Sequence, residues 1–231
     1  MLELIQNYWV YFLIGQYPNG PLGGLALTVS LAALGLALSL PLGLLLGLAR
    51  LSPWRALRWP VTALVHLVRG TPLLLVIFWT YFFLPSVTGH KTGQFGTMLA
   101  ALVLFDAVHL AEIVRAGVAG LPAGQAEAAR SLGLGYAATL RWVVLPQALR
   151  HMLPSLVNQF VSTIKETSLG YIIGLTEAAF IASQINVQVL TKSTEVYFLL
   201  GLTYFILCFG LSRCAFWLEQ REGGAKKGCA A

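Results

Sequence analysis

The sequence predicts an all-α membrane protein, and three observations support this fold class. Of the 231 residues, 57% are apolar and only 10% are charged, whereas about a quarter of the residues in a soluble domain are charged. The mean hydropathy is +0.75. Long apolar runs recur along the chain, and a helix needs about 20 such residues to cross a bilayer core of about 30 Å. A soluble enzyme is therefore excluded.

Five apolar segments predict five membrane-spanning helices. The first is rich in Leu, Ala and Gly, and no charged residue occurs from Leu4 to Ala49. The second begins with Pro60, a residue that suits the first turn of a helix. In chain order the expected helices are Leu22–Leu48, Pro60–Leu84, Phe95–Val114, Met152–Leu175 and Val196–Leu211.

The basic residues of the loops predict the orientation in the membrane. Eleven of the fifteen Lys and Arg residues follow the first, third or fifth predicted helix, and the loops on the other side hold only Lys91 and Lys192. We therefore expect a multi-pass membrane protein with the N-terminus outside and the C-terminus in the cytoplasm. Because the basic residues flank apolar runs and do not gather on one stripe, they indicate membrane topology and not nucleic acid binding.

The chain divides into three predicted parts. Residues 1–19 contain several aromatic residues and few charges, which favours a helix lying on the outer surface. Residues 20–218 form the transmembrane domain, which includes a cytoplasmic loop at about residues 116–150, and residues 219–231 form a cytoplasmic tail. The three cysteines, Cys208, Cys214 and Cys229, have no metal-binding spacing, so we expect neither a disulfide nor a metal site.

The cytoplasmic loop predicts a helical hairpin. Gly124 to Leu132 has the composition of a helix, Gly133 and Gly135 interrupt it, and a second helix runs from Tyr136 to Leu145 before Pro146. Such an amphipathic hairpin could lie on lipid head groups or fill a groove on a cytosolic partner.

Several motifs resemble one family of membrane proteins. In the loop, Glu127-Ala128-Ala129, Gly133 and Val143-x-Leu145-Pro146 have the spacing of the EAA loop in permease subunits of bacterial ABC importers, with Val143 in place of the usual Ile. The polar amino acid branch of that family, which includes histidine, glutamine, arginine, opine and glutamate/aspartate permeases, is similar over roughly residues 20–218. Further matching motifs are Arg69-Gly70-Thr71-Pro72-Leu73-Leu74, Ala111-Glu112-Ile113-Val114-Arg115, Gly124-Gln125, Leu145-Pro146-Gln147-Ala148 and Lys165-x-Thr167-Ser168-Leu169.

The resemblance implies a subunit of an importer with the type I permease fold. Its partners would be ABC ATPase subunits, a second copy or a sister permease, an extracytoplasmic substrate-binding protein and membrane lipid. The hairpin would dock into the ATPase through Glu127, Ala128, Ala129, Arg130, Gly133, Arg141 and Pro146. None of the five lysines follows a glycine, so the chain lacks a Walker A motif. We expect no cofactor or catalytic residue in this chain, with ATP and Mg bound by the partner.

Ionisable residues inside predicted spans are candidates for the substrate pathway, because a charge at the bilayer centre is costly. Arg69 precedes Pro72, which removes a backbone hydrogen bond and predicts a bend beside the cation. This arrangement suits an anionic group held at a broken helix, although Arg69 could instead pair with a neighbour such as Glu112.

Two further groups of polar residues lie in the third and fourth predicted spans. Asp106, His109 and Glu112 recur every three residues, so they lie within an arc of about 120° on one helix face. They could line the pathway or form a structural network at a subunit interface. The family commonly has Tyr where His109 stands, and Asp106 is unusual there. In the fourth span, Lys165, Thr167 and Ser168 interrupt the apolar run.

The sequence therefore predicts the transmembrane subunit of an ATP-driven importer of a polar amino acid, with glutamate or aspartate favoured. Arg69 and Lys165 could each bind a substrate carboxylate. The alternatives are a secondary transporter driven by protons through Asp106, His109 and Glu112, and a membrane scaffold that transports nothing. A proton-driven transporter would function without a cytosolic ATPase, and a scaffold would tolerate substitutions in the polar stripe.

Overall fold

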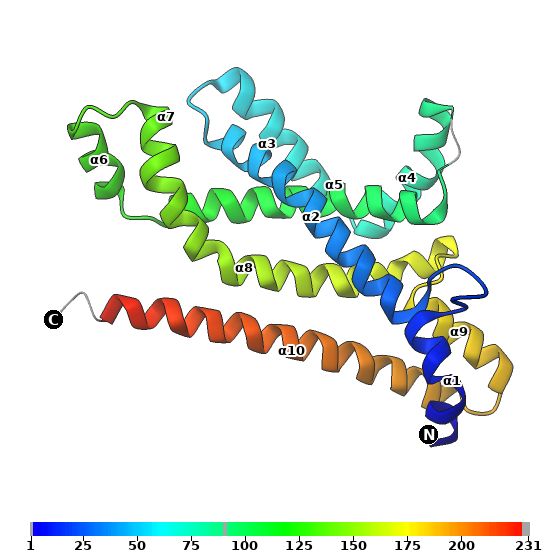
Figure 1. Ribbon diagram of the computed structural model, residues 1–231. Helices are drawn as coiled ribbons and strands as arrows, with labels where there is room; N and C mark the ends of the chain where they lie inside the picture. Colours follow the sequence, from blue (N-terminus) through cyan, green and yellow to red (C-terminus); the bar gives the residue numbers. More distant parts are fainter. Residues whose placement is uncertain (1, 90–91, 228–231) are drawn as a thin grey trace.

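The computed structural model describes residues 2–89 and 92–227, and this part of the chain is helical (Figure 1). Lys91 and Cys229 lie outside the described residues. The elements in chain order are α1 (Leu2–Ile14), α2 (Gly24–Leu51), α3 (Arg55–Arg69), α4 (Leu73–Thr88), α5 (Gln94–Ala119), α6 (Ala123–Ser131), α7 (Tyr136–Thr139), the π-helix η1 (Leu140–Val144), α8 (Leu145–Glu166), the 3-10 helix η2 (Thr167–Ile173), α9 (Ala178–Val189) and α10 (Ser193–Lys227).

Close packing of α2 against α5 forms the centre of the fold. Small residues recur at every fourth position of α2, and these positions are buried against α5. A Cβ atom added at Gly43 would lie 2.5 Å from Cβ of Leu110, and one at Gly47 would lie 2.7 Å from Cβ of Val114. In a membrane, helices associate largely through such close van der Waals contact.

The second predicted span is broken into α3 and α4, which are bent by 104°. The predicted bend beside Arg69 is confirmed, because α3 ends at Arg69 and Pro72 is the N-cap of α4. The expected start at Pro60 is wrong. The helix begins at Arg55, and Pro60 lies inside it. The preceding loop ends at Trp54, which has the extended backbone of an N-cap residue, six positions before Pro60.

The fourth predicted span also differs from expectation. The α-helix α8 begins at Leu145 and ends at Glu166, and η2 follows it. Gly174 then adopts φ +78, a left-handed conformation that turns the chain into α9. By length and apolarity, α2, α5 and Ser193–Cys214 of α10 are candidate spans, and the bent pair α3 and α4 is a fourth. The number of five spans stays a prediction.

The two ends of the helical bundle carry different elements (Figure 1). The hairpin of α6 and α7 lies at one end, together with the C-terminal part of α10, whereas α1 and α9 lie at the other end. The first helix packs through Leu4 and Phe12 on Ile181, Ile185 and Val196 of α9 and α10. The last helix continues past residue 218, where the predicted transmembrane domain ends, to Lys227.

Candidate functional site

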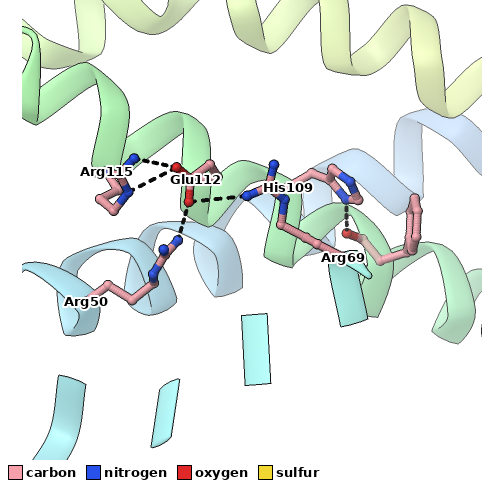
Figure 2. Close-up of polar contacts among 6 residues, drawn as sticks. Arg50, Arg69, His109, Glu112 and Arg115 are labelled. Carbon is pink, nitrogen blue, oxygen red and sulfur yellow. Dashed lines mark hydrogen bonds and ion pairs between the residues drawn. The ribbon is translucent and has the colours of Figure 1, made fainter. Parts of the chain in front are cut away.

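Glu112 of α5 accepts contacts from three arginines on three helices (Figure 2). Arg50 at the end of α2 approaches with Nη1 2.5 Å from Oε2, and Arg115 of α5 approaches with Nη2 2.5 Å from Oε1. Arg69, the last residue of α3, lies farther away, with Nη1 3.3 Å from Oε2. The break after Arg69 therefore places its side chain beside α5, and the structure shows the pairing with Glu112.

We call Arg50, Arg69, Glu112 and Arg115 the arginine cluster. Three positive groups against one negative group leave a net charge of +2. The Arg50 side chain is only 5% exposed, whereas Arg69 and Arg115 are 36% and 39% exposed. Arg69 combines a long contact with partial exposure, so it is the guanidinium that a competing carboxylate would displace from Glu112 at least cost.

The side chains of Asp106, His109 and Glu112 do not form one polar network, because each contacts a different part of the structure. Asp106 is fully buried and accepts hydrogen bonds from Gln159 Nε2 at 2.9 Å and Thr163 Oγ1 at 3.0 Å, both on α8. Nδ1 of His109 lies 2.9 Å from the carbonyl oxygen of Phe105. No hydrogen bond within the described residues joins the three side chains to one another. Asp106 thus holds α5 against α8.

A second polar site surrounds Lys165, the exposed residue near the end of α8. It is a pocket of about 440 Å³ whose polar lining comes from Lys165, Ser168, Tyr171, Ser183, Tyr197 and Tyr204. Ser168 also donates to the carbonyl oxygen of Lys165 at 2.6 Å. Thr167 is buried and donates to Ile164 at 2.7 Å, so its hydroxyl stabilises the start of η2 and does not face this pocket.

Glu177 is a buried acid that the sequence analysis missed. It is the N-cap of α9, where its carboxylate accepts from the backbone N–H groups of Ala179 and Phe180, both at 2.9 Å. The Tyr204 hydroxyl of α10 also donates to it at 3.1 Å. An acidic residue before a helix is the available signal in the sequence. The contact with Tyr204 depends on the tertiary structure.

The hairpin of α6 and α7 has the predicted form of a helix, a bend and a helix. Gly133 adopts φ +85 after α6. Its N–H donates to Arg130 at 2.9 Å, and the N–H of Leu134 donates to Ala129 at 3.2 Å. These two bonds form a Schellman motif, in which a residue with positive φ ends a helix. Glycine is favoured at this position because it has no Cβ.

Most of the predicted ATPase-contacting residues are exposed on this hairpin. Glu127, Ala128, Arg130, Gly133, Arg141 and Pro146 are all exposed. Ala129 is different, because it is only 4% exposed. Ala129 lies on the inner side of α6, so its burial gives no support to the prediction that it contacts the ATPase. Arg141 lies over the ring of Trp142, with 5.2 Å between Cζ and the ring centroid.

The second arm of the hairpin continues into α8 without a stop at Pro146. The turn of η1 is wider than an α-helical turn, and the N–H of Leu145 donates to Leu140. A proline ring normally clashes with the carbonyl four residues earlier, and a π turn changes the local hydrogen-bond pattern before it. The expected end of the helix at Leu145 is therefore wrong. The second arm of the hairpin, formed by α7 and η1, and α8 together form one continuous helix.

Comparisons with known proteins agree with these features. A family model described as the inner membrane component of binding-protein-dependent transport systems matches residues 39–223. The probable glutamine ABC transporter permease protein GlnP of Bacillus subtilis is 39% identical over 215 residues, covering 90% of this chain and 98% of GlnP. The inner membrane amino-acid ABC transporter permease protein YhdY of Escherichia coli is 38% identical over 218 residues, covering 93% of this chain and 59% of YhdY.

The fold is also found among solved structures. One chain in the crystal structure of an amino acid ABC transporter with histidines has a TM-score of 0.79 and 30% identity, covering 86% of this chain and 92% of that chain.

Proposed function

Because the chain belongs to the family of inner membrane components of binding-protein-dependent transport systems, we propose that it is the membrane-spanning subunit of an ATP-driven importer of a polar amino acid. YhdY is named as an amino-acid ABC transporter permease and GlnP as a probable glutamine ABC transporter permease. Both names support an amino acid as the substrate. The bacterial inner membrane is the expected location, with the N-terminus outside and the C-terminus in the cytoplasm.

The observation that carries this proposal is the exposed hairpin of α6 and α7. Its outer surface offers Glu127, Arg130 and Arg141 for charged contacts, and the small Ala128 permits close approach. The continuous helix through η1 joins the hairpin to α8, where Gln159 and Thr163 hold Asp106 of α5. A movement of an ATPase docked on the hairpin would therefore reach the centre of the helical bundle.

The complete importer would contain several partners. ATPase subunits would bind ATP and Mg and dock on the hairpin, a second copy or a sister permease would complete the membrane passage, and an extracytoplasmic binding protein would deliver the substrate. The permease would alternate between outward-facing and inward-facing states as the ATPases close and open. No step of ATP hydrolysis is assigned to residues of this chain.

We propose glutamate or aspartate as the preferred substrate on electrostatic grounds. The arginine cluster has a net charge of +2, and Lys165 adds a cation in a pocket lined by hydroxyl groups. A carboxylate that reached Arg69 would compete with Glu112 for a bidentate guanidinium contact. Glutamate and aspartate carry a net charge of −1 and a neutral amino acid carries none, so the positive charge of either site favours the acidic amino acids.

The proton-driven alternative is disfavoured by the side-chain contacts. A relay through Asp106, His109 and Glu112 needs these groups, or bridging groups, in sequence along one path. Instead, Asp106 is held by α8, His109 by its own helix and Glu112 by three arginines.

The decisive experiment is transport in proteoliposomes that contain the chain, its ATPase and, if the permease is not a homodimer, its sister permease. Uptake of radiolabelled amino acids is measured with the binding protein outside and ATP inside. We expect uptake that requires ATP and the binding protein and that is strongest for glutamate or aspartate. Uptake driven by a proton gradient without ATP would overturn the proposal, and strongest uptake of a neutral or basic amino acid would overturn the substrate assignment.

A further inference from the structure

A basic and aromatic surface at the start of α3 has no function in the proposed transport cycle. It consists of Trp54, Arg55, Arg58 and Trp59, and we call it the α3 patch. The two indole side chains are 74% and 65% exposed, and both arginines are exposed. A recess of about 260 Å³ continues the patch along the same helix and is lined by Arg58, Trp59, Thr62, Ala63 and His66.

The two arginines of the α3 patch have no acidic partner. The chain contains no acidic residue between Glu3 and Asp106, and Glu112 is already in contact with the three arginines of its cluster. Within the part of the chain that the structure describes, the guanidinium groups of Arg55 and Arg58 make no hydrogen bond or ion pair, although the backbone N–H of Arg58 donates to Trp54. A positive charge is therefore left on this surface, and an anionic partner would neutralise it.

The position of α3 decides what that partner can be. Near its C-terminal end, α3 packs through Val65 and Val68 on Val108 and Ala111 of α5, whereas the residues of the α3 patch at its N-terminal end are exposed. The hydroxyl of Tyr136 in α7 donates to the carbonyl oxygen of Leu51 at 2.8 Å, just before α3 begins. The α3 patch therefore lies beside the hairpin, at the end of the bundle for which the basic loops predict the cytoplasmic side.

We propose that the α3 patch binds the phosphodiester head group of an anionic phospholipid in the inner leaflet. Guanidinium groups bind phosphate through paired hydrogen bonds, and Trp side chains are enriched at the level of the head groups. The N-terminal end of α3 adds the positive end of the helix dipole, which is favourable for a phosphate. The recess beside Trp59 supplies the Thr62 hydroxyl and the His66 ring as further polar groups for the head group.

The charge complementarity selects this occupant over a zwitterionic lipid. Each basic residue near an anionic membrane surface contributes about 1 kcal/mol to binding, which is about a five-fold change in affinity. The substitution of both arginines by Gln should therefore weaken binding of phosphatidylglycerol by about 25-fold, while binding of phosphatidylcholine stays nearly the same.

The test uses the full-length chain assembled with its ATPase partner in nanodiscs of phosphatidylcholine, alone or mixed with phosphatidylglycerol. Native mass spectrometry measures retained lipid for the wild type, the Arg55→Gln/Arg58→Gln variant and the Arg55→Lys/Arg58→Lys variant. Arg213→Gln is the matched control, because Arg213 is an exposed arginine beside an aromatic ring on α10. We expect an about 25-fold loss of phosphatidylglycerol in the Gln variant, partial retention in the Lys variant and no more than the about five-fold effect of one basic residue in the control.

Two results of this comparison would overturn the proposal, and a separate arm with inorganic phosphate provides a third. One is equal retention of phosphatidylglycerol by the wild type and the Gln variant. The other is loss of the ATPase from the Gln variant with lipid retention unchanged, which would identify the α3 patch as a protein contact. Inorganic phosphate is added in a separate arm, and displacement of the lipid by phosphate at low concentration would show that the site selects the free anion.

Discussion

Arg50 and Glu112 form an ion pair that joins the last turn of α2 to the C-terminal half of α5, with 2.5 Å between Nη1 and Oε2. The Arg50 side chain is nearly buried, and its Nε has no hydrogen-bond partner within the described structure. Glu112 is thus required to compensate a cation that has little access to solvent. Arg69 and Arg115 share the same carboxylate from more exposed positions.

We predict that Arg50→Ala destabilises the protein more than Arg115→Ala does. The first variant removes the most buried partner of Glu112, but Arg69 and Arg115 still compensate the carboxylate, so the cost should stay below the about 3–5 kcal/mol of an uncompensated buried charge. The exposed partner should contribute less than about 1 kcal/mol. Thermal unfolding of the detergent-solubilised variants, followed by size-exclusion chromatography, measures the difference. Equal melting temperatures for the two variants would contradict this ranking.

Arg69 should be important for substrate handling and less important for assembly. We predict that Arg69→Lys lowers uptake and that Arg69→Ala lowers it further, because lysine cannot form the bidentate contact of a guanidinium. Assembly with the ATPase and basal ATP hydrolysis should survive, while hydrolysis stimulated by the loaded binding protein should drop. Uptake by Arg69→Ala at the wild-type rate would exclude this residue from the substrate path, and Lys165 would then be the next candidate.

Gly133→Asp should uncouple the permease from its ATPase. Gly133 has φ +85 at the bend of the hairpin, where a residue with a Cβ costs up to about 1–2 kcal/mol and Asp less than most, so the substitution adds modest backbone strain to a new charge. We expect normal membrane insertion, weaker co-purification of the ATPase and reduced uptake. Gly135→Asp is the control, because Gly135 has φ −66 and the substitution adds the same charge without backbone strain. The same loss of coupling in both variants would attribute the effect to charge and not to the bend.

Gly43→Ala should weaken the packing of α2 on α5. The new Cβ would lie 2.5 Å from Cβ of Leu110 and 3.0 Å from the carbonyl oxygen of Ala107, so the helices must separate, and overpacking of this kind costs about 1–3 kcal/mol. Gly201→Ala on α10 is the control, because no atom lies within 4 Å of the position that its new Cβ would take. Thermal stability in detergent distinguishes them, and a fully stable Gly43→Ala variant would show that the helices can move apart at little cost.

The predicted orientation places the start of α3 and the hairpin on the cytoplasmic side of the membrane. A single cysteine introduced at Arg55, in a background without the native cysteines, should resist a membrane-impermeant maleimide in intact cells and react after the membrane is opened. A cysteine introduced near the N-terminus, at Gln6, should react in both cases. Labelling of the Arg55 position from outside would reverse the topology and remove the basis for an inner-leaflet lipid.

The amino-acid sequence alone was enough to predict the fold class, the long helices α2, α5 and α10, the break after Arg69 and the bend at Gly133. These features depend on local properties: the length of an apolar run, the missing N–H of Pro72 and the freedom of glycine at positive φ. The helical composition of residues 124–145, interrupted by Gly133 and Gly135, also predicted the hairpin. Such signals act within a few turns of one helix and need no knowledge of the neighbouring elements.

Which polar groups meet could be learned only from the packed helices. Arg50 was counted among the basic loop residues, yet the close crossing of α2 and α5 brings it to Glu112. Asp106 and Glu112 share a helix face in projection, but α8 lies beside one and the ends of α2 and α3 beside the other. The partners of a charged side chain depend on the packing of helices that are far apart in sequence, because contacts with those helices supply the hydrogen bonds and opposite charges that its burial requires.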